Sequence, residues 1–187
     1  MSIKYNGSYH TSEEMEKNFK HFHNKIIKIC DKYNAKVEES RDLYEVEGEK
    51  YPKVSKSFDI CVDENETITV WLNNDDVDNG KKIGKEGLYI EYEIYNNDKK
   101  YDFNLDFVIE LINEMSCVSI TKSVLEKLLH ATESKFPNIS VDTKKNKKVY
   151  NYDFWENTFI RYDAGMSMYE DDKYLETLSY SAYCKDI

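Results

Sequence analysis

Acidic and aromatic side chains alternate with apolar ones in two segments of the chain, and their types are suited to recognising a ligand. The segments are 57–72 and 88–95, and the residues are Trp71, Tyr89, Glu91, Glu93 and Tyr95. Tyr and Trp supply large, rigid contact area, and carboxylates attract cations. The pattern therefore predicts a binding surface, and these five residues are its first candidates.

The residue types that carry catalysis or hold metals do not occur at useful spacings. His21 and His23 are two positions apart on a predicted helix, about 200° around it, so they cannot chelate one ion together. The sequence has no Gly-rich phosphate loop and no G-x-S-x-G elbow. We expect no metal, no cofactor and no enzyme. An enzyme of unidentified class, with a site assembled from distant residues, stays an alternative.

The four cysteines, Cys30, Cys61, Cys117 and Cys184, lie far apart in the sequence. Three of them sit in apolar-patterned stretches. Buried free thiols are therefore expected rather than disulfides or a metal knuckle.

An acidic loop between the two alternating segments superficially resembles a calcium loop, with Asp75, Asp76 and Asp78 followed by Glu86. Val77 occupies a position where calcium needs an oxygen ligand, so the resemblance is attributed to chance. The three aspartates remain candidates for contact with a partner.

Strands must position these candidates. Period-two alternation predicts a hairpin in which Phe58, Ile60, Val62, Ile68, Val70 and Leu72 are buried. A three-residue loop, 64–66, would place Ile60 opposite Val70 and Val62 opposite Ile68. In the third segment, Leu88, Ile90, Tyr92 and Ile94 should share the buried face. The opposite face would carry Asp59, Asp63, Thr67, Thr69, Trp71, Tyr89, Glu91, Glu93 and Tyr95.

Helices are predicted before and after this region. Thr11 and Glu14 form a capping box, apolar residues recur over 12–34, and Asn34 can end that helix in a left-handed conformation. Two shorter helices are expected around 107–115 and 122–135. The narrow apolar stripe of the first helix could also serve as a dimer seam, but packing on the sheet is favoured.

Further strands are expected at 43–46, at 101–103, and at 150–154, 158–162 and 178–184. Residues 163–165 and 170–173 read as turns. The sequence thus predicts one α+β domain over residues 1–187, with a long N-terminal helix and a central helical pair packed on a mainly antiparallel sheet.

The net charge of −10 is unevenly distributed, because residues 37–121 alone hold 21 acidic and 9 basic side chains. Such a field repels nucleic acids and membrane surfaces and attracts basic partners. No apolar run suggests a secretion signal or membrane anchor, so a cytoplasmic protein is expected.

These features lead us to expect a non-enzymatic inhibitor or immunity-type protein, whose acidic face mimics nucleic acid and binds a basic toxin or nucleic-acid-handling enzyme. In charge and size the chain is similar to small anti-CRISPR and anti-restriction proteins, although it carries no family motif. The alternative is a winged-helix nucleic-acid binder, since residues 122–148 carry 3 acidic and 7 basic side chains. The sequence leaves a homodimer open.

Overall fold

The computed structural model describes residues 12–44, 53–73, 77–78, 81–82, 87–96, 103–130, 140–142, 147–155, 158–166 and 174–183. Its elements are α1 (Ser12–Lys32), β1 (Lys36–Tyr44), β2 (Lys53–Cys61), β3 (Glu66–Asn73), β4 (Val77–Asp78), β5 (Lys81–Lys82), β6 (Gly87–Asn96), α2 (Leu105–Met115), α3 (Lys122–Leu129), β7 (Ser140–Asp142), β8 (Lys147–Trp155), β9 (Thr158–Met166) and β10 (Tyr174–Tyr183). Among the described residues, eight strands form one sheet in the order β1-β2-β3-β6-β10-β9-β8-β7, and β4 and β5 form a second, two-stranded sheet. The paired strands are all antiparallel in the part of the chain that the structure describes, which confirms the predicted α+β fold.

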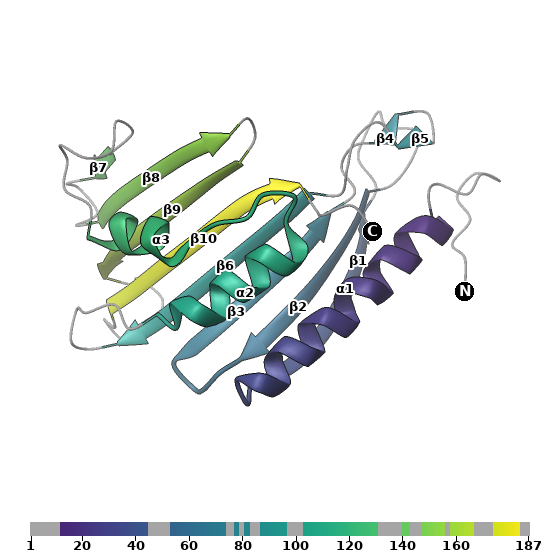
Figure 1. The fold of residues 1–187 in the computed structure, drawn as a ribbon, viewed down its shortest axis with the longest axis horizontal. Coiled ribbons are helices and arrows are strands. Elements are labelled where there is room, and N and C mark those ends of the chain that lie inside the picture. Colours follow the sequence, from purple (N-terminus) through teal and green to yellow (C-terminus); the bar gives the residue numbers. More distant parts are fainter. Residues whose placement is uncertain are drawn as a thin grey trace.

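The three described helices lie on the same face of the sheet (Figure 1). α1 lies along the β1 side, α2 crosses the middle of the sheet, and α3 lies over the β8 and β9 side. The core between these layers contains residues from all three helices and from strands β2, β3, β6, β9 and β10. The predicted helical pair therefore exists, although α3 ends at Leu129 and residues 131–135 lie outside the described part of the chain.

The predicted stripe and end of α1 are confirmed. Its buried residues are Phe19, Phe22, Ile26, Ile29 and Cys30. Asn34 has a φ of 55°. The Ala35 N–H donates to the Cys30 carbonyl at 3.0 Å, and the Asn34 N–H donates to that of Asp31 at 3.3 Å, which is the Schellman pattern. The predicted capping box at Thr11 and Glu14 lies outside the described side chains.

A buried lysine ties α1 to the sheet. Lys56 of β2 forms an ion pair with Glu39 of β1, and its ammonium lies 5.4 Å from the ring centroid of Phe19 and 5.6 Å from that of Phe58. His23 of α1 contacts the other oxygen of Glu39 at 2.5 Å. Burial alone would raise the pKa of Glu39, but its bonds and charge interactions with Lys56 and His23 outweigh that effect and lower it.

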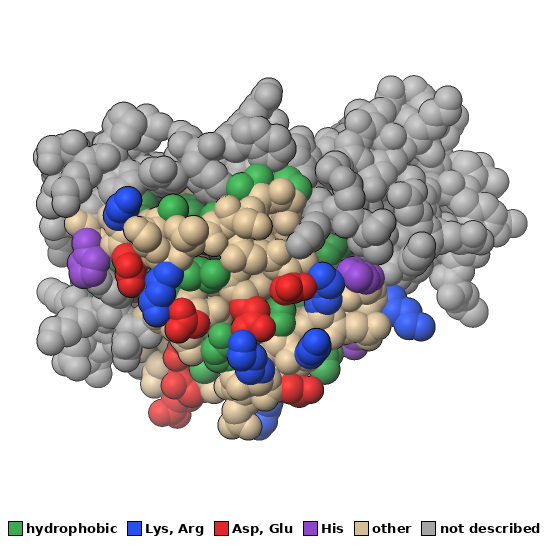
Figure 2. Space-filling view, viewed as in Figure 1, with side chains coloured by type: hydrophobic (Ala, Val, Ile, Leu, Met, Phe, Trp, Pro, Cys, Tyr) green, Lys and Arg blue, Asp and Glu red, His purple; other side chains and the backbone are tan. Residues whose placement is uncertain are grey.

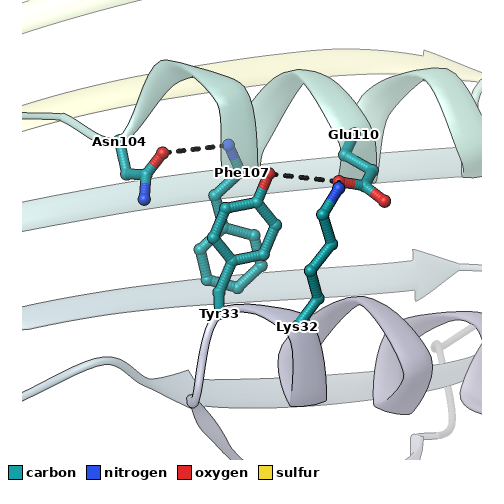
Figure 3. A network of polar contacts seen from close by, with 5 residues as sticks. All are labelled: Lys32, Tyr33, Asn104, Phe107 and Glu110. Atoms are coloured by element: carbon teal, nitrogen blue, oxygen red, sulfur yellow. Dashed lines mark hydrogen bonds and ion pairs between the residues drawn. The ribbon is translucent and has the colours of Figure 1, made fainter.

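α1 and α2 are joined by a stacked ring pair and by the ion pair of Lys32 with Glu110 (Figure 3). The rings of Tyr33 and Phe107 are 4.2 Å apart between centroids and nearly parallel. Glu110 accepts from the Tyr33 hydroxyl at 3.1 Å and from Lys32 at 2.6 Å. Asn104 caps α2 by accepting from the Phe107 N–H at 3.2 Å. These contacts fix both helices on the same side of the sheet.

The predicted hairpin has the correct faces but the wrong register. Phe58, Ile60, Ile68, Val70 and Leu72 are buried as predicted, and Val62 is partly buried. However, Ile60 faces Ile68 rather than Val70, because the loop is 63–65 and not 64–66. The Asp63 carboxylate accepts from the Asn65 N–H at 2.7 Å, which starts the turn one residue earlier.

Three other predicted boundaries also need correction. Residues 43–44 of the expected strand at 43–46 are the end of a longer edge strand, β1, and residues 45–46 lie outside the described residues. Of the strand expected at 101–103, residues 101–102 lie outside the described residues. Phe103 is not in a strand and packs edge-on against Tyr92, with ring centroids 4.9 Å apart. Residues 163–165 form no turn, because β9 continues to Met166. The predicted turn at 170–173 lies outside the described residues.

The cysteines agree with the prediction only in part. Cys30, Cys61 and Cys117 are free thiols, and Cys184 lies outside the described residues. Cys30 is buried, but Cys61 is exposed and Cys117 is half-buried. Cys61 alternates with the buried Ile60, so its side chain points to the opposite side of the sheet.

Candidate binding surface on the sheet

The side of the sheet opposite the three described helices carries most of the predicted site residues, and it is termed the far face here. Its side chains alternate along each strand with the buried core residues. The C-terminal strands β8, β9 and β10 extend the sheet edge to edge. They therefore do not stack on the far face.

The predicted residues on β3 and β6 come together on this face. Trp71 pairs with Tyr89, Thr69 with Glu91, and Thr67 with Glu93. These six side chains and Tyr95 are half-buried, and Asp59 is exposed. Among the other predicted partner residues, Asp75 and Asp76 lie outside the described part, while Asp78 belongs to the separate β4–β5 pair.

The central residues of the far face contact one another. The Trp71 and Tyr89 rings are tilted by 45°, with centroids 5.2 Å apart. The Tyr89 hydroxyl donates to Oε2 of Glu91 at 2.8 Å. Burial, followed by the bond to Glu91, raises the pKa of Tyr89 to about 12, against smaller opposing effects of Ser179 and Arg161. The hydroxyl therefore stays protonated at neutral pH and holds the carboxylate in place.

The far face continues onto β10 and β9, which the sequence interpretation did not include. Glu91 pairs with Ser179, which pairs with Arg161, and Glu93 pairs with Thr177, which pairs with Asp163. Arg161 Nε lies 2.7 Å from Asp163 Oδ2. Asp163, Thr177 and Ser179 are themselves buried, so this part of the far face offers little exposed surface. The alternation of Thr177 and Ser179 with the apolar Leu178 in the sequence was the signal that could have revealed them.

The described part of the far face is mainly acidic. Its charged side chains are Glu38, Asp59, Glu91, Glu93 and Asp163 against Lys36 and Arg161. Because Arg161 is paired with Asp163, the negative charge is concentrated on β1, β2 and β6. This half of the face is the one that contains Trp71.

No protein-family model matches the sequence, and the searches of curated proteins and of solved structures found no match. The function must therefore be inferred from the geometry of this chain.

The helix side of the molecule has a different charge pattern. Figure 2 shows acidic and basic side chains interspersed over the described part of that side. Several are paired, as Lys25 is with Glu114 at 2.8 Å and Lys122 with Asp106 at 3.0 Å. Neighbouring charges of opposite sign largely cancel at a distance, so the described residues of this side produce no single-sign field.

The described residues offer little for catalysis. They contain no group of three or more His, Cys, Asp or Glu side chains that could hold a metal ion. Burial raises the pKa of Cys30 to about 12, so this thiol is protonated at neutral pH and is not a nucleophile. Ser116 is buried and hydrogen-bonded to the Tyr180 hydroxyl.

Within the described ranges, no helix is long and apolar enough to cross a membrane.

The described parts of the segment proposed for a winged helix belong to the main fold. β7 and β8 form a hairpin, but β8 also pairs with β9 as part of the eight-stranded sheet. α3 buries Leu125, Leu128 and Leu129. Its exposed residues include Glu126 beside Lys127. Lys144 and Lys145 lie outside the described residues.

Proposed function

We propose that this protein is a non-enzymatic inhibitor or immunity-type protein that binds a basic partner protein through the far face of its sheet. The observation that carries the proposal is the Trp71–Tyr89 ring pair, which lies beside Glu91 on a face where carboxylates predominate. Aromatic residues of this kind dominate binding energy at interfaces, and carboxylates next to them select a positively charged surface.

The overall charge distribution also favours binding of a basic partner through the far face. The chain carries a net charge of −10, and the helix side presents mixed charges. A basic protein approaching in solution is therefore attracted overall and oriented toward the more acidic far face. This attraction weakens as added salt screens the charges, over about 10 Å at 0.1 M.

The partner class follows from the same chemistry. Proteins that handle nucleic acids present clustered Lys and Arg side chains to phosphates. A sheet face with several carboxylates presents a comparable pattern of negative charge and would compete with the nucleic acid. We therefore place the partner among nucleic-acid-handling enzymes or toxins, with the protein acting as a nucleic-acid mimic in a cytoplasmic setting.

A comparative capture experiment tests this function. Immobilised wild-type protein, the Glu91→Gln/Glu93→Gln variant and the Asp31→Asn/Glu126→Gln variant are each exposed to host lysate, and retained proteins are identified by mass spectrometry. Asp31 and Glu126 are exposed on α1 and α3. The Asp31→Asn/Glu126→Gln variant therefore has the same net charge as the Glu91→Gln/Glu93→Gln variant but keeps an intact far face.

The expected result is a basic protein retained by the wild type and by the helix-side variant but lost with the far-face variant. Once purified, that partner should lose nucleic-acid binding when the wild-type protein is added. Equal retention by all three proteins, or a partner whose nucleic-acid binding is unaffected, would contradict the proposal.

A further inference from the structure

The geometry of the far face points to the chemical group that it recognises: we propose that Trp71, Tyr89, Glu91 and Asp59 together take one arginine side chain of the partner. This inference rests on the proposed function and specifies it. It concerns which cation is bound, where the proposed function requires only that a basic protein binds.

The four residues occupy two neighbouring rows across three strands. Asp59 pairs with Thr69, which pairs with Glu91, so a short side chain separates two carboxylates. Trp71 and Tyr89 form the next row on the same face. Neighbouring strands are about 4.8 Å apart, and rows on one face are about 6.8 Å apart. Rings and carboxylates are thus within reach of one planar cation.

Tyr89 has two functions in this arrangement. Its ring pairs with Trp71, and its hydroxyl holds Oε2 of Glu91 at 2.8 Å. A carboxylate offers about four lone-pair sites, so Glu91 can accept this bond and still accept donors from a partner. The anionic acceptor is therefore oriented before the partner arrives, which reduces the entropy lost on binding.

These features favour arginine over lysine. A guanidinium is planar, stacks on aromatic faces and donates in a fixed fork to a carboxylate. An ammonium is a compact, strongly hydrated charge that does not stack in the same way. The chain's own Arg161 is ion-paired with Asp163 on β9, two strands away from Glu91, and its charge acts on Tyr89 only as a minor effect on the pKa.

A peptide titration followed by NMR tests the inference. The probes are three capped peptides of the pattern Gly-Ser-X-Gly-Ser-X-Gly-Ser, in which X is Arg, Lys or citrulline. The readout is the indole N–H signal of Trp71, one of 2 tryptophans in the chain, assigned by its loss in Trp71→Phe. The variant Trp71→Phe serves only to assign the signal, and the titrations themselves use the wild-type protein.

The arginine peptide should shift the Trp71 signal and bind about tenfold more tightly than the lysine peptide, while the citrulline peptide should leave the signal unchanged. In Tyr89→Phe, which keeps the ring and removes the hydroxyl, the preference for arginine should fall severalfold. In Glu126→Gln, on the helix side, the preference should persist.

Equal affinity for the arginine and lysine peptides would overturn the inference and leave the proposed function standing. No shift of the Trp71 signal with any peptide would also overturn it. The proposed function has its own test. It would be contradicted if the captured partner bound the Glu91→Gln/Glu93→Gln variant as tightly as it binds the wild type.

Discussion

Trp71 and Tyr89 face each other across β3 and β6, and their sequence neighbours Leu72 and Leu88 face each other in the core on the other side of the same two strands. One pair of strands thus presents a buried aliphatic pair to the helices and a half-buried aromatic pair to the far face. The two pairs should respond differently to truncation.

The first prediction compares Leu72→Ala with Trp71→Ala. Leu72 is fully buried, so its truncation should lower the free energy of unfolding by about 2–5 kcal/mol. Trp71→Ala removes the ring pair with Tyr89 but opens no cavity in the helix-covered core, and it should cost about 1–2 kcal/mol. Urea unfolding measures both values. If Trp71→Ala destabilised the protein as much as Leu72→Ala, Trp71 would be a core residue.

The second prediction concerns acid stability and Glu39. Because its pKa is lowered from 4.5 in the folded protein, Glu39 contributes stability that is fully present above about pH 4.5 and is lost as the pH falls through the folded pKa. Glu39→Gln should therefore be less stable than the wild type at neutral pH, and the difference should shrink in acid. Melting temperatures across this range provide the measurement.

The matched control for Glu39→Gln is Glu38→Gln, one residue away and on the opposite face of β1. It leaves the contact with Lys56 intact, so its stability should follow that of the wild type as the pH falls. The same acid dependence in Glu39→Gln as in the wild type would show that the Lys56 ion pair contributes nothing to stability.

The third prediction concerns alkaline stability and Tyr180. Burial raises its pKa from 10.0 to about 12, with a smaller increase from Cys117 and an opposing effect of the Ser116 hydroxyl. A raised pKa means that the contribution of Tyr180 is present below about pH 10 and is lost as the pH rises toward 12. Tyr180→Phe should be less stable than the wild type at pH 8, and the difference should shrink between pH 10 and 12. A difference that stays constant up to pH 12 would contradict the assignment.

The alternation of apolar and polar residues predicts which side chains of the sheet are buried, but it does not predict which residues pair across the strands. Alternation identified the buried rows of β2, β3 and β6, because burial on one face requires a period of two. It could not distinguish Ile60 opposite Ile68 from Ile60 opposite Val70, because registers that differ by two residues bury the same face. The Asp63 turn decided between them, and an aspartate that bonds the backbone two residues later was the available signal.

Strand segments rich in charged residues were not predicted from the sequence. β1 begins at Lys36, directly after the helix end, but Val37 is its only apolar residue before Leu43. It is an edge strand, and edge strands commonly carry charges that prevent pairing with other chains. Because a charged residue interrupts the apolar pattern, Asp163 was also interpreted as part of a turn. In the structure it extends β9 beside Arg161 and enlarges the far face.

The fourth prediction addresses the alternative of nucleic-acid binding through residues 122–148. An acidic protein whose basic hairpin is an edge of the main sheet should not retard DNA or RNA in a gel, even at low ionic strength. Retardation that disappears when Lys144, Lys145, Lys147 and Lys148 are replaced with Gln would favour the alternative over the proposed function.

The most direct test of the account is the affinity of the purified partner for Trp71→Ala, measured by calorimetry beside the wild type and the Asp31→Asn/Glu126→Gln control. If the far face is the binding surface, Trp71→Ala should weaken binding by at least about 2 kcal/mol, or roughly 30-fold, while circular dichroism shows an intact fold. The control should change the affinity by less than about twofold. An unchanged affinity in folded Trp71→Ala, or a large loss in the control alone, would place the binding surface elsewhere on the molecule and contradict the account.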